Sequence, residues 1–197
     1  MPEAHESLEH AENAEHASHS NRGVALVIAI LALFLSFSEM LGKSSQTEAI
    51  GANVEASNLW SFFQAKTVRQ TMLRTASEQL KITAEAAADP ATRAAMEKQV
   101  EAWQKTVARY DTEPETHEGR KELADRAKEA EESRNTFLAK YEAYEIASAA
   151  FQIGIVLASA AVITKIVLLV WAAGLLGAGG IAMIGLGLFA PHALHAI

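Results

Sequence analysis

The sequence predicts an all-α protein with three transmembrane helices and a long extramembrane helical hairpin that resembles a coiled-coil stalk. Long apolar runs are confined to residues 24–41 and 146–190, whereas residues 42–145 hold 33 of the 41 charged residues. Between the two runs, apolar residues recur at alternating steps of three and four, which is typical of helices packed along their length. Two proline-marked breaks divide this middle segment into three helical pieces.

The composition argues against several classes of function. The formal net charge of −7 disfavours nucleic-acid binding, which needs a basic face. The chain has no cysteine, so disulfides and thiolate metal sites are excluded. It also has no phosphate-binding glycine loop, no G-x-S-x-G and no H-E-x-x-H. We therefore expect a protein that is not an enzyme and carries no cofactor.

The first 22 residues form a tail in which glutamate recurs at every third position from 3 to 15, with histidines between. Three-residue spacing does not keep side chains on one helix face, so we expect residues 1–22 to be disordered. His16 and His19 are the weak metal candidates because they stand in an i, i+3 relation, as do His192 and His195. A metal or pH sensor in the cell envelope is the corresponding alternative function.

The first predicted transmembrane helix covers residues 23–42. Residues 24–41 would span about 27 Å as a helix, close to the hydrocarbon thickness of a bilayer. A cleaved signal peptide is the alternative, but the preceding tail is acidic and Arg22 is its single Lys or Arg. We therefore interpret this run as an uncleaved membrane span.

The extramembrane segment, residues 43–145, reads as helix apart from breaks at Asp89-Pro90 and 112–119. Both ends of the segment must return to the membrane, which favours an antiparallel hairpin with its tip at Asp89-Pro90. A compact three-helix bundle is the alternative. Residues 43–84 carry a net charge of +2 and residues 85–145 a net charge of −5, which favours arms that face each other.

An aromatic cluster followed by polar residues marks the first arm, in the stretch SNLWSFFQAKTVRQ. The aromatic side chains cover a wider face than one partner arm would bury. Lys66 and Gln70 occupy heptad positions that are usually apolar, where polar groups specify register and oligomeric state. Because alanine-rich arms bury little area, we expect self-association. The predicted packing residues are Trp60, Phe62, Phe63, Lys66 and Gln70 in the first arm and Arg134, Phe137, Tyr141 and Tyr144 in the third helical piece.

The second apolar run is too long for one crossing and about right for two. Lys165 marks the predicted turn, since a lysine is costly at mid-membrane. This gives spans at 146–163 and 167–190, followed by a short tail over 191–197. Small residues at four-residue spacing predict close helix packing within the hairpin or between protomers: Ala150, Gly154 and Ala158 in one span and Gly174, Ala178 and Ala182 in the other.

The stretches EASNLWSFFQAKTVRQ (55–70) and AFQIGIVLASAAVITK (150–165) carry a likeness. Together with the His- and Glu-rich tail and the first span, they resemble an uncharacterised bacterial membrane-protein family, domain of unknown function number 4337. The resemblance covers nearly the whole chain. It implies a bacterial source and a location in the cytoplasmic membrane, and it brings no known activity or site residues.

The expected function is a non-enzymatic structural or assembly protein of the bacterial inner membrane. It would form a homo-oligomer or serve as an accessory subunit of a larger membrane complex, with the lipid bilayer as its other partner. A small channel or transporter-like protein using the glycine-rich spans is an alternative. Arg22 and Lys165 lie on one side of three spans, which places the N-terminus in the cytoplasm and the stalk in the periplasm.

Overall fold

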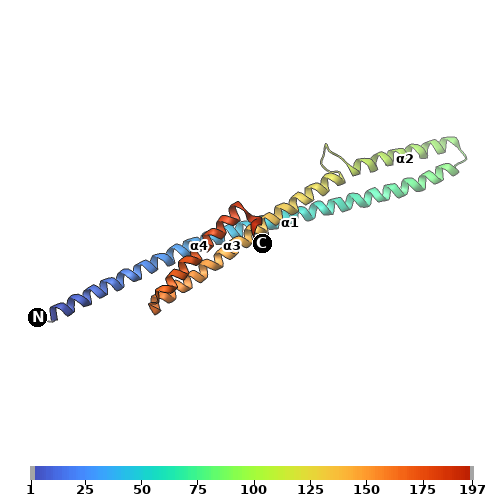
Figure 1. The fold of residues 1–197 in the computed structure, drawn as a ribbon. Coiled ribbons are helices and arrows are strands. Elements are labelled where there is room, and N and C mark those ends of the chain that lie inside the picture. The colour runs from blue at the N-terminus through green and yellow to red at the C-terminus, as the bar shows by residue number, and fades with distance from the viewer. Residues whose placement is uncertain (1–2, 196–197) are drawn as a thin grey trace. The chain divides into compact units, whose positions relative to one another are not determined.

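The computed structural model describes the backbone of residues 3–195 and the side chains of residues 22–193. Over this backbone the chain forms four α-helices, one short 3-10 helix and no strand (Figure 1). The all-α prediction is therefore confirmed. The elements are α1 (Glu3–Ala86), α2 (Pro90–Asp111), α3 (Arg120–Thr164), α4 (Val167–Phe189) and the 3-10 helix η1 (Pro191–His195).

Helix α1 is continuous over 84 residues and contains both the first apolar run and the first arm of the hairpin. It begins at Glu3, within the tail, whose alanine and glutamate residues have high helix propensity whatever face they occupy. The disorder predicted for residues 1–22 stays a prediction. The side chains of His16 and His19 lie outside the described residues.

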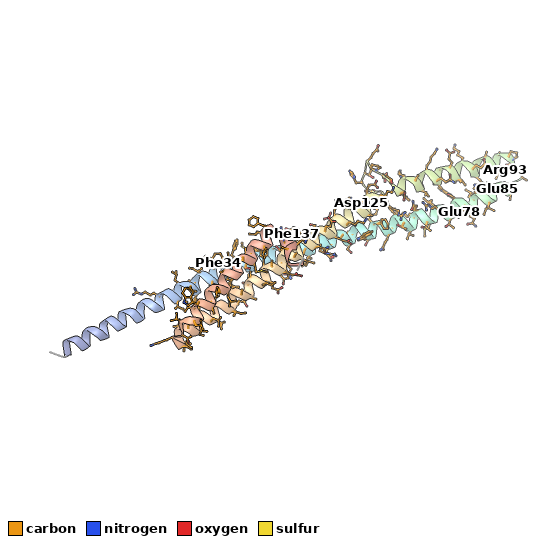
Figure 2. The ribbon with its side chains drawn as sticks, viewed as in Figure 1. Phe34, Glu78, Glu85, Arg93, Asp125 and Phe137 are labelled. Atoms are coloured by element: carbon orange, nitrogen blue, oxygen red, sulfur yellow. The ribbon has the colours of Figure 1, made fainter. Side chains whose placement is uncertain are left out.

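The connection between α1 and α2 is a capped turn. Asp89 is the N-cap of α2, and its carboxylate accepts a hydrogen bond from the backbone N–H of Thr92 at 2.9 Å, with Pro90 in the first helical turn. Hydrogen bonds from Thr92 lower the pKa of the Asp89 carboxyl. On the other side of the turn, Arg93 donates to the backbone carbonyls of Ala87 at 2.9 Å and Glu85 at 3.4 Å, and Figure 2 labels Arg93 and Glu85. These bonds satisfy polar groups that the helix ends leave free.

The connection between α3 and α4 consists of Lys165 and Ile166. Lys165 adopts a left-handed conformation with φ of 58°, and its N–H donates to the carbonyl of Ala161 at 2.9 Å. This is the bond of an αL helix cap, which ends a helix and satisfies one of its last carbonyls. The lysine that the sequence singled out therefore lies at the turn itself.

The chain divides into two compact units, each described separately. Unit 1 contains residues 1–48 and 136–197, and unit 2 contains residues 49–135. Unit 1 packs α3 and α4 with the first part of α1 around a core that includes Leu31, Tyr144 and Phe151.

In unit 2, α1 packs against the start of α3 around Leu59 and Leu123, and it contacts α2 further along. The pairing is antiparallel: Asn53 contacts Arg134, and Gln70 contacts Val107. Lys66 and Gln70, the two polar heptad positions that the sequence singled out in this arm, are buried at 5 % and 2 % exposure.

Candidate functional site

Lys66 is a buried cation in the middle of unit 2. Its ammonium group donates to the backbone oxygen of Glu118 and lies 3.5 Å from the Glu113 carboxylate and 3.7 Å from that of Glu118. The rings of Phe62 and Tyr110 lie 5.2 and 5.7 Å from the same nitrogen. Carboxylates, a carbonyl and aromatic faces thus surround the charge, which compensates for part of its lost hydration.

Gln70, one helical turn further on, joins α1 to both sides of the break between α2 and α3. Its amide donates to the backbone oxygen of Val107 at 3.1 Å and accepts a hydrogen bond from Arg120 at 2.6 Å. Arg120 also donates to Thr67 Oγ1 at 2.9 Å and lies 3.4 Å from Asp111 Oδ1. Because Val107 near the end of α2 and Arg120 at the start of α3 meet the same side chain, residues 112–119 form a loop beside the helical pairing.

The aromatic side chains next to these residues complete the packing. Trp60 Nε1 donates to the Glu131 carboxylate at 2.8 Å, and the Trp60 and Phe63 rings meet edge to face at 5.5 Å. The Arg120 guanidinium lies 4.9 Å from the centre of the Phe63 ring. Both aromatics pack on the core around Leu123. Trp60 and Phe63 therefore have partners within their own hairpin.

The loop of residues 112–119 is closed on itself. The backbone N–H of Glu113 donates to the Glu122 carboxylate at 3.3 Å, and His117 has a left-handed φ of 55°. A Cβ on Gly119 would meet the Glu122 carboxylate, the Glu113 nitrogen and the Thr112 Cα. Only glycine fits at this position unless the loop backbone moves. We call Lys66, Gln70 and Arg120 the anchoring cluster, since they hold this loop against α1.

The anchoring cluster has the chemistry of a structural joint. Lys66 and Gln70 donate hydrogen bonds to backbone carbonyls, and Arg120 donates to the Gln70 side chain. Among the described residues, no group of three or more His, Asp or Glu side chains is placed to hold a metal ion.

Unit 1 carries a second set of close contacts, in which large side chains enter gaps above glycines. Leu31 of α1 lies against Gly154 of α3 and Gly177 of α4. Phe151 of α3 faces Gly180 of α4 and stacks on Phe34 of α1 at 5.9 Å, and Figure 2 labels Phe34. Such gaps allow helix backbones to approach closely.

A buried hydrogen bond joins α1 to α3 in the same unit. Ser38 is fully buried, and its hydroxyl donates to the backbone oxygen of Tyr144 at 2.9 Å. Gly42 and Gly187 flank this level, each with its α-carbon facing the Tyr144 side chain. The hydrogen bond between Ser38 and Tyr144 fixes how α1 and α3 are positioned along each other within unit 1.

The small-residue stripes predicted from the sequence divide between buried and exposed positions. Gly154 and Ala158 are buried and Ala150 is half-buried, as close packing requires. The second stripe is exposed within the chain: Gly174, Ala178 and Ala182. The buried face of α4 is instead formed by Ala173, Gly177, Gly180, Ile184 and Gly187. On α4, the packed face is the one whose glycines meet Leu31, Phe151 and Tyr144. The packed face of α4 therefore depends on side chains that belong to α1 and α3.

The predicted packing residues of the third helical piece also have partners inside the chain. Arg134 donates to Asn53 Oδ1 at 3.2 Å, and the Lys140 ammonium lies 5.4 Å from the Phe137 ring centre. Tyr144 is 2 % exposed. Coulombic repulsion by Glu145 raises the pKa of Tyr141. Their predicted role between protomers stays a prediction, since one chain is described.

The histidine pairs can be placed only in part. His16, His19 and His195 have side chains outside the described residues. His192 Nε2 lies 3.1 Å from the hydroxyl of Thr136, so η1 sits beside α3 within unit 1.

Two important residues escaped the sequence analysis. Arg120 binds Gln70, but it precedes the heptad pattern of its helix, and nothing local showed that it would lie opposite an amide. Ser38 is one of few hydroxyls in an apolar run, which is a signal that could have marked it.

These features define the class of protein. The chain is all-α, and three of its helices contain segments long and apolar enough to cross a membrane: Arg22–Ala86, Arg120–Thr164 and Val167–Phe189. A second unit is a charged helical hairpin. The chain belongs to the family described as Domain of unknown function (DUF4337), whose model matches residues 20–190. No curated protein and no solved structure matches it.

Proposed function

We propose that this protein is a non-enzymatic structural or assembly protein of a bacterial inner membrane. Unit 1 would be a three-helix membrane anchor, and unit 2 an extramembrane stalk that associates with further copies or with a larger membrane complex. The observation that carries the proposal is the contrast between the surfaces of the two units.

Among the described side chains of unit 1, all three helices expose large apolar residues. Large apolar side chains that are exposed within the chain follow α1, α3 and α4: Leu26, Ile30, Leu33, Phe37, Met40, Ile153, Val156, Val162, Ile163, Val167, Leu168, Trp171, Leu175, Ile181, Leu188 and Phe189. A soluble protein rarely exposes so large a contiguous patch. A lipid environment would cover these side chains, and Ser38 already has an internal hydrogen-bond partner there.

The interior of unit 1 supports an anchor more than a channel. Leu31 and Phe151 fill the gaps above Gly154, Gly177 and Gly180. Side chains therefore occupy the space between the helices at these levels. A conduit would need a polar path there.

The connections support three crossings. Helix α3 is followed by a turn at Lys165, and α4 returns until His192 contacts Thr136 of α3. This proposal puts the stalk and the C-terminus on one side of the membrane and the N-terminus on the other. Arg22 and Lys165 then favour a cytoplasmic N-terminus and a periplasmic stalk.

Cysteine accessibility tests the arrangement directly, since the chain has no cysteine of its own. Ala95→Cys lies in the stalk, and Ile166→Cys lies at the turn between α3 and α4. In intact cells an impermeant maleimide should label the first variant and not the second until the membrane is opened. Equal labelling of both, or release of the protein from membranes by alkaline washing, would contradict the anchor.

The assembly role is tested by the native mass of the full chain in detergent. We expect a defined oligomer or a stable complex with other membrane proteins. A monodisperse monomer at all concentrations, with no co-purifying partner, would refute this part of the proposal.

A further inference from the structure

Helix α1 has a second apolar face in unit 2 that its own hairpin leaves uncovered. Among the described side chains of this unit, the large apolar residues that are exposed all belong to α1: Ile50, Val54, Phe62, Val68, Met72 and Ile82. Val68, Met72 and Ile82 are 53, 66 and 70 % exposed. The arm formed by α2 and α3 shows no such side chain in this unit. The exposed apolar surface is therefore a property of one helix.

Four of these six residues, Val54, Val68, Met72 and Ile82, follow a second heptad repeat, whereas Ile50 and Phe62 lie beside it. Steps of four and three connect Val54, Asn58, Ser61, Ala65, Val68, Met72, Thr75, Gln79 and Ile82, and all nine are exposed. None of the nine is charged, although charged residues are frequent on the rest of the hairpin. At 100° per residue this face lies about 150° from the face that Lys66 and Gln70 occupy. We call these nine residues the outer heptad face.

The pattern indicates what kind of surface would cover this face. Heptad spacing keeps side chains in line along a partner helix, whereas a small ligand needs no such repeat. A shallow apolar groove lies along its centre, lined by Val68, Thr71, Met72, Thr75 and Gln79. The pattern therefore favours a helix as the partner.

The charge pattern points to a second copy of the same chain. An uncharged face can meet its own copy without repulsion, as a symmetric contact requires. In a parallel pair the residues flanking the face would match Gln64 with Arg69 and Glu78 with Thr83, so no like charges meet. Both copies of α1 also leave the membrane in the same direction, because the first span and this arm are one helix.

We propose that the outer heptad faces of α1 from two or more copies pack together, parallel and in register. The inference rests on the proposed membrane topology and self-association, and it assigns the contact to Val54–Ile82. Asn58 and Gln79 would lie at the a positions, where a polar residue fixes register. Val54, Val68 and Ile82 would lie at d positions, where β-branched residues favour assemblies of more than two helices.

Single-cysteine cross-linking of the full chain tests the contact. Cysteines replacing Ala65, Val68, Met72 and Thr75 in turn should form dimers under mild oxidation several-fold more readily than Arg74→Cys, which is exposed but off the face. Efficient cross-linking at all four face positions requires a parallel, in-register pair, since an antiparallel pair would bring together only positions near its axis.

A charge on the face provides the second test. Met72→Glu should shift the oligomer to smaller species at a given concentration, and Met72→Leu at the same position should not. Because Met72 is exposed, both variants should retain the helicity of the wild type.

The outcomes separate this inference from the proposed function. A stable oligomer whose face cysteines cross-link no better than Arg74→Cys would overturn the inference and leave self-association standing. That result would also follow if a different protein covers the face. A wild-type monomer would overturn both.

Discussion

Replacing Gln70 by leucine should loosen the joint between α2 and α3. Leucine has nearly the volume of glutamine, so the substitution removes two hydrogen bonds without opening a large cavity. Arg120 would lose the acceptor at 2.6 Å, and the carbonyl of Val107 would lose the donor at 3.1 Å. Gln70 is 2 % exposed, so water cannot readily replace either bond.

The magnitude follows from these bonds. A hydrogen bond to a charged group contributes about 1.5–3 kcal/mol and a neutral one about 1 kcal/mol. Burying the more apolar leucine side chain offsets roughly 1 kcal/mol. The expected net loss is about 2 kcal/mol, which is about thirtyfold in the equilibrium between closed and open loop.

Hydrogen exchange measured peptide by peptide is the suitable assay, since a chain of two units need not unfold in one step. Amides near Val107 and Arg120 should exchange about thirtyfold faster in Gln70→Leu than in the wild type. Gln46→Leu makes the same change at an exposed position on α1, away from the outer heptad face, and should have little effect. Equal exchange in the two variants would refute the role given to Gln70.

Three further predictions test other contacts. Gly180→Ala places a Cβ 2.7 Å from the Phe151 ring and should destabilise unit 1 by about 1–3 kcal/mol in detergent. Gly179→Ala adds its Cβ in open space and should not destabilise the unit. Similar melting temperatures for the two variants would contradict the packing. Gly119→Ala should make the loop after α2 a preferred site of limited proteolysis, and an unchanged digestion pattern would argue against the tight closure. Because hydrogen bonding lowers the pKa of Asp89, its cap stabilises α2 above about pH 4 and is lost as the pH falls through the lowered value. The protection factors of amides at the start of α2, which are exchange rates corrected for the intrinsic effect of pH, should then fall at the lower pH, and the asparagine variant D89N should lack this effect.

Helix boundaries were the most predictable part of the fold because their signals are local. Asp89 and Pro90 mark the start of α2 by themselves. Asp89 caps the helix with its side chain, and the fixed φ of Pro90 suits the first helical position. Lys165 marked a turn because its charge is costly within an apolar run. The tail before Arg22 was harder, since its residue types favour helix while their spacing gives no face to pack.

The choice of packing face on α4 could not be made from its own sequence. Its glycines are frequent enough that several stripes satisfy a four-residue spacing. Phe151 of α3 decides the matter, because its ring needs the gap above Gly180 and not the surface near Gly174. The role of Arg120 could not be predicted for the same reason, since it depends on a hydrogen bond to Gln70, fifty residues away.

Lys66 and Gln70 show why a polar residue in a heptad need not indicate a contact between protomers. Their positions predicted a device for register, and the structure gives that device an internal target, the loop that interrupts the opposite arm. The continuous helix α1 packs against an arm that is interrupted between α2 and α3. The backbone groups at this interruption need hydrogen-bond partners, which the buried polar side chains of α1 supply. The face that we propose for self-association is the uncharged one on the other side of α1, around Val68 and Met72. The predicted role of Lys66 and Gln70 between protomers stays a prediction. Disrupting the anchoring cluster should loosen the hairpin and leave the cross-linking of the outer heptad face largely intact, because α1 carries that face on its own backbone.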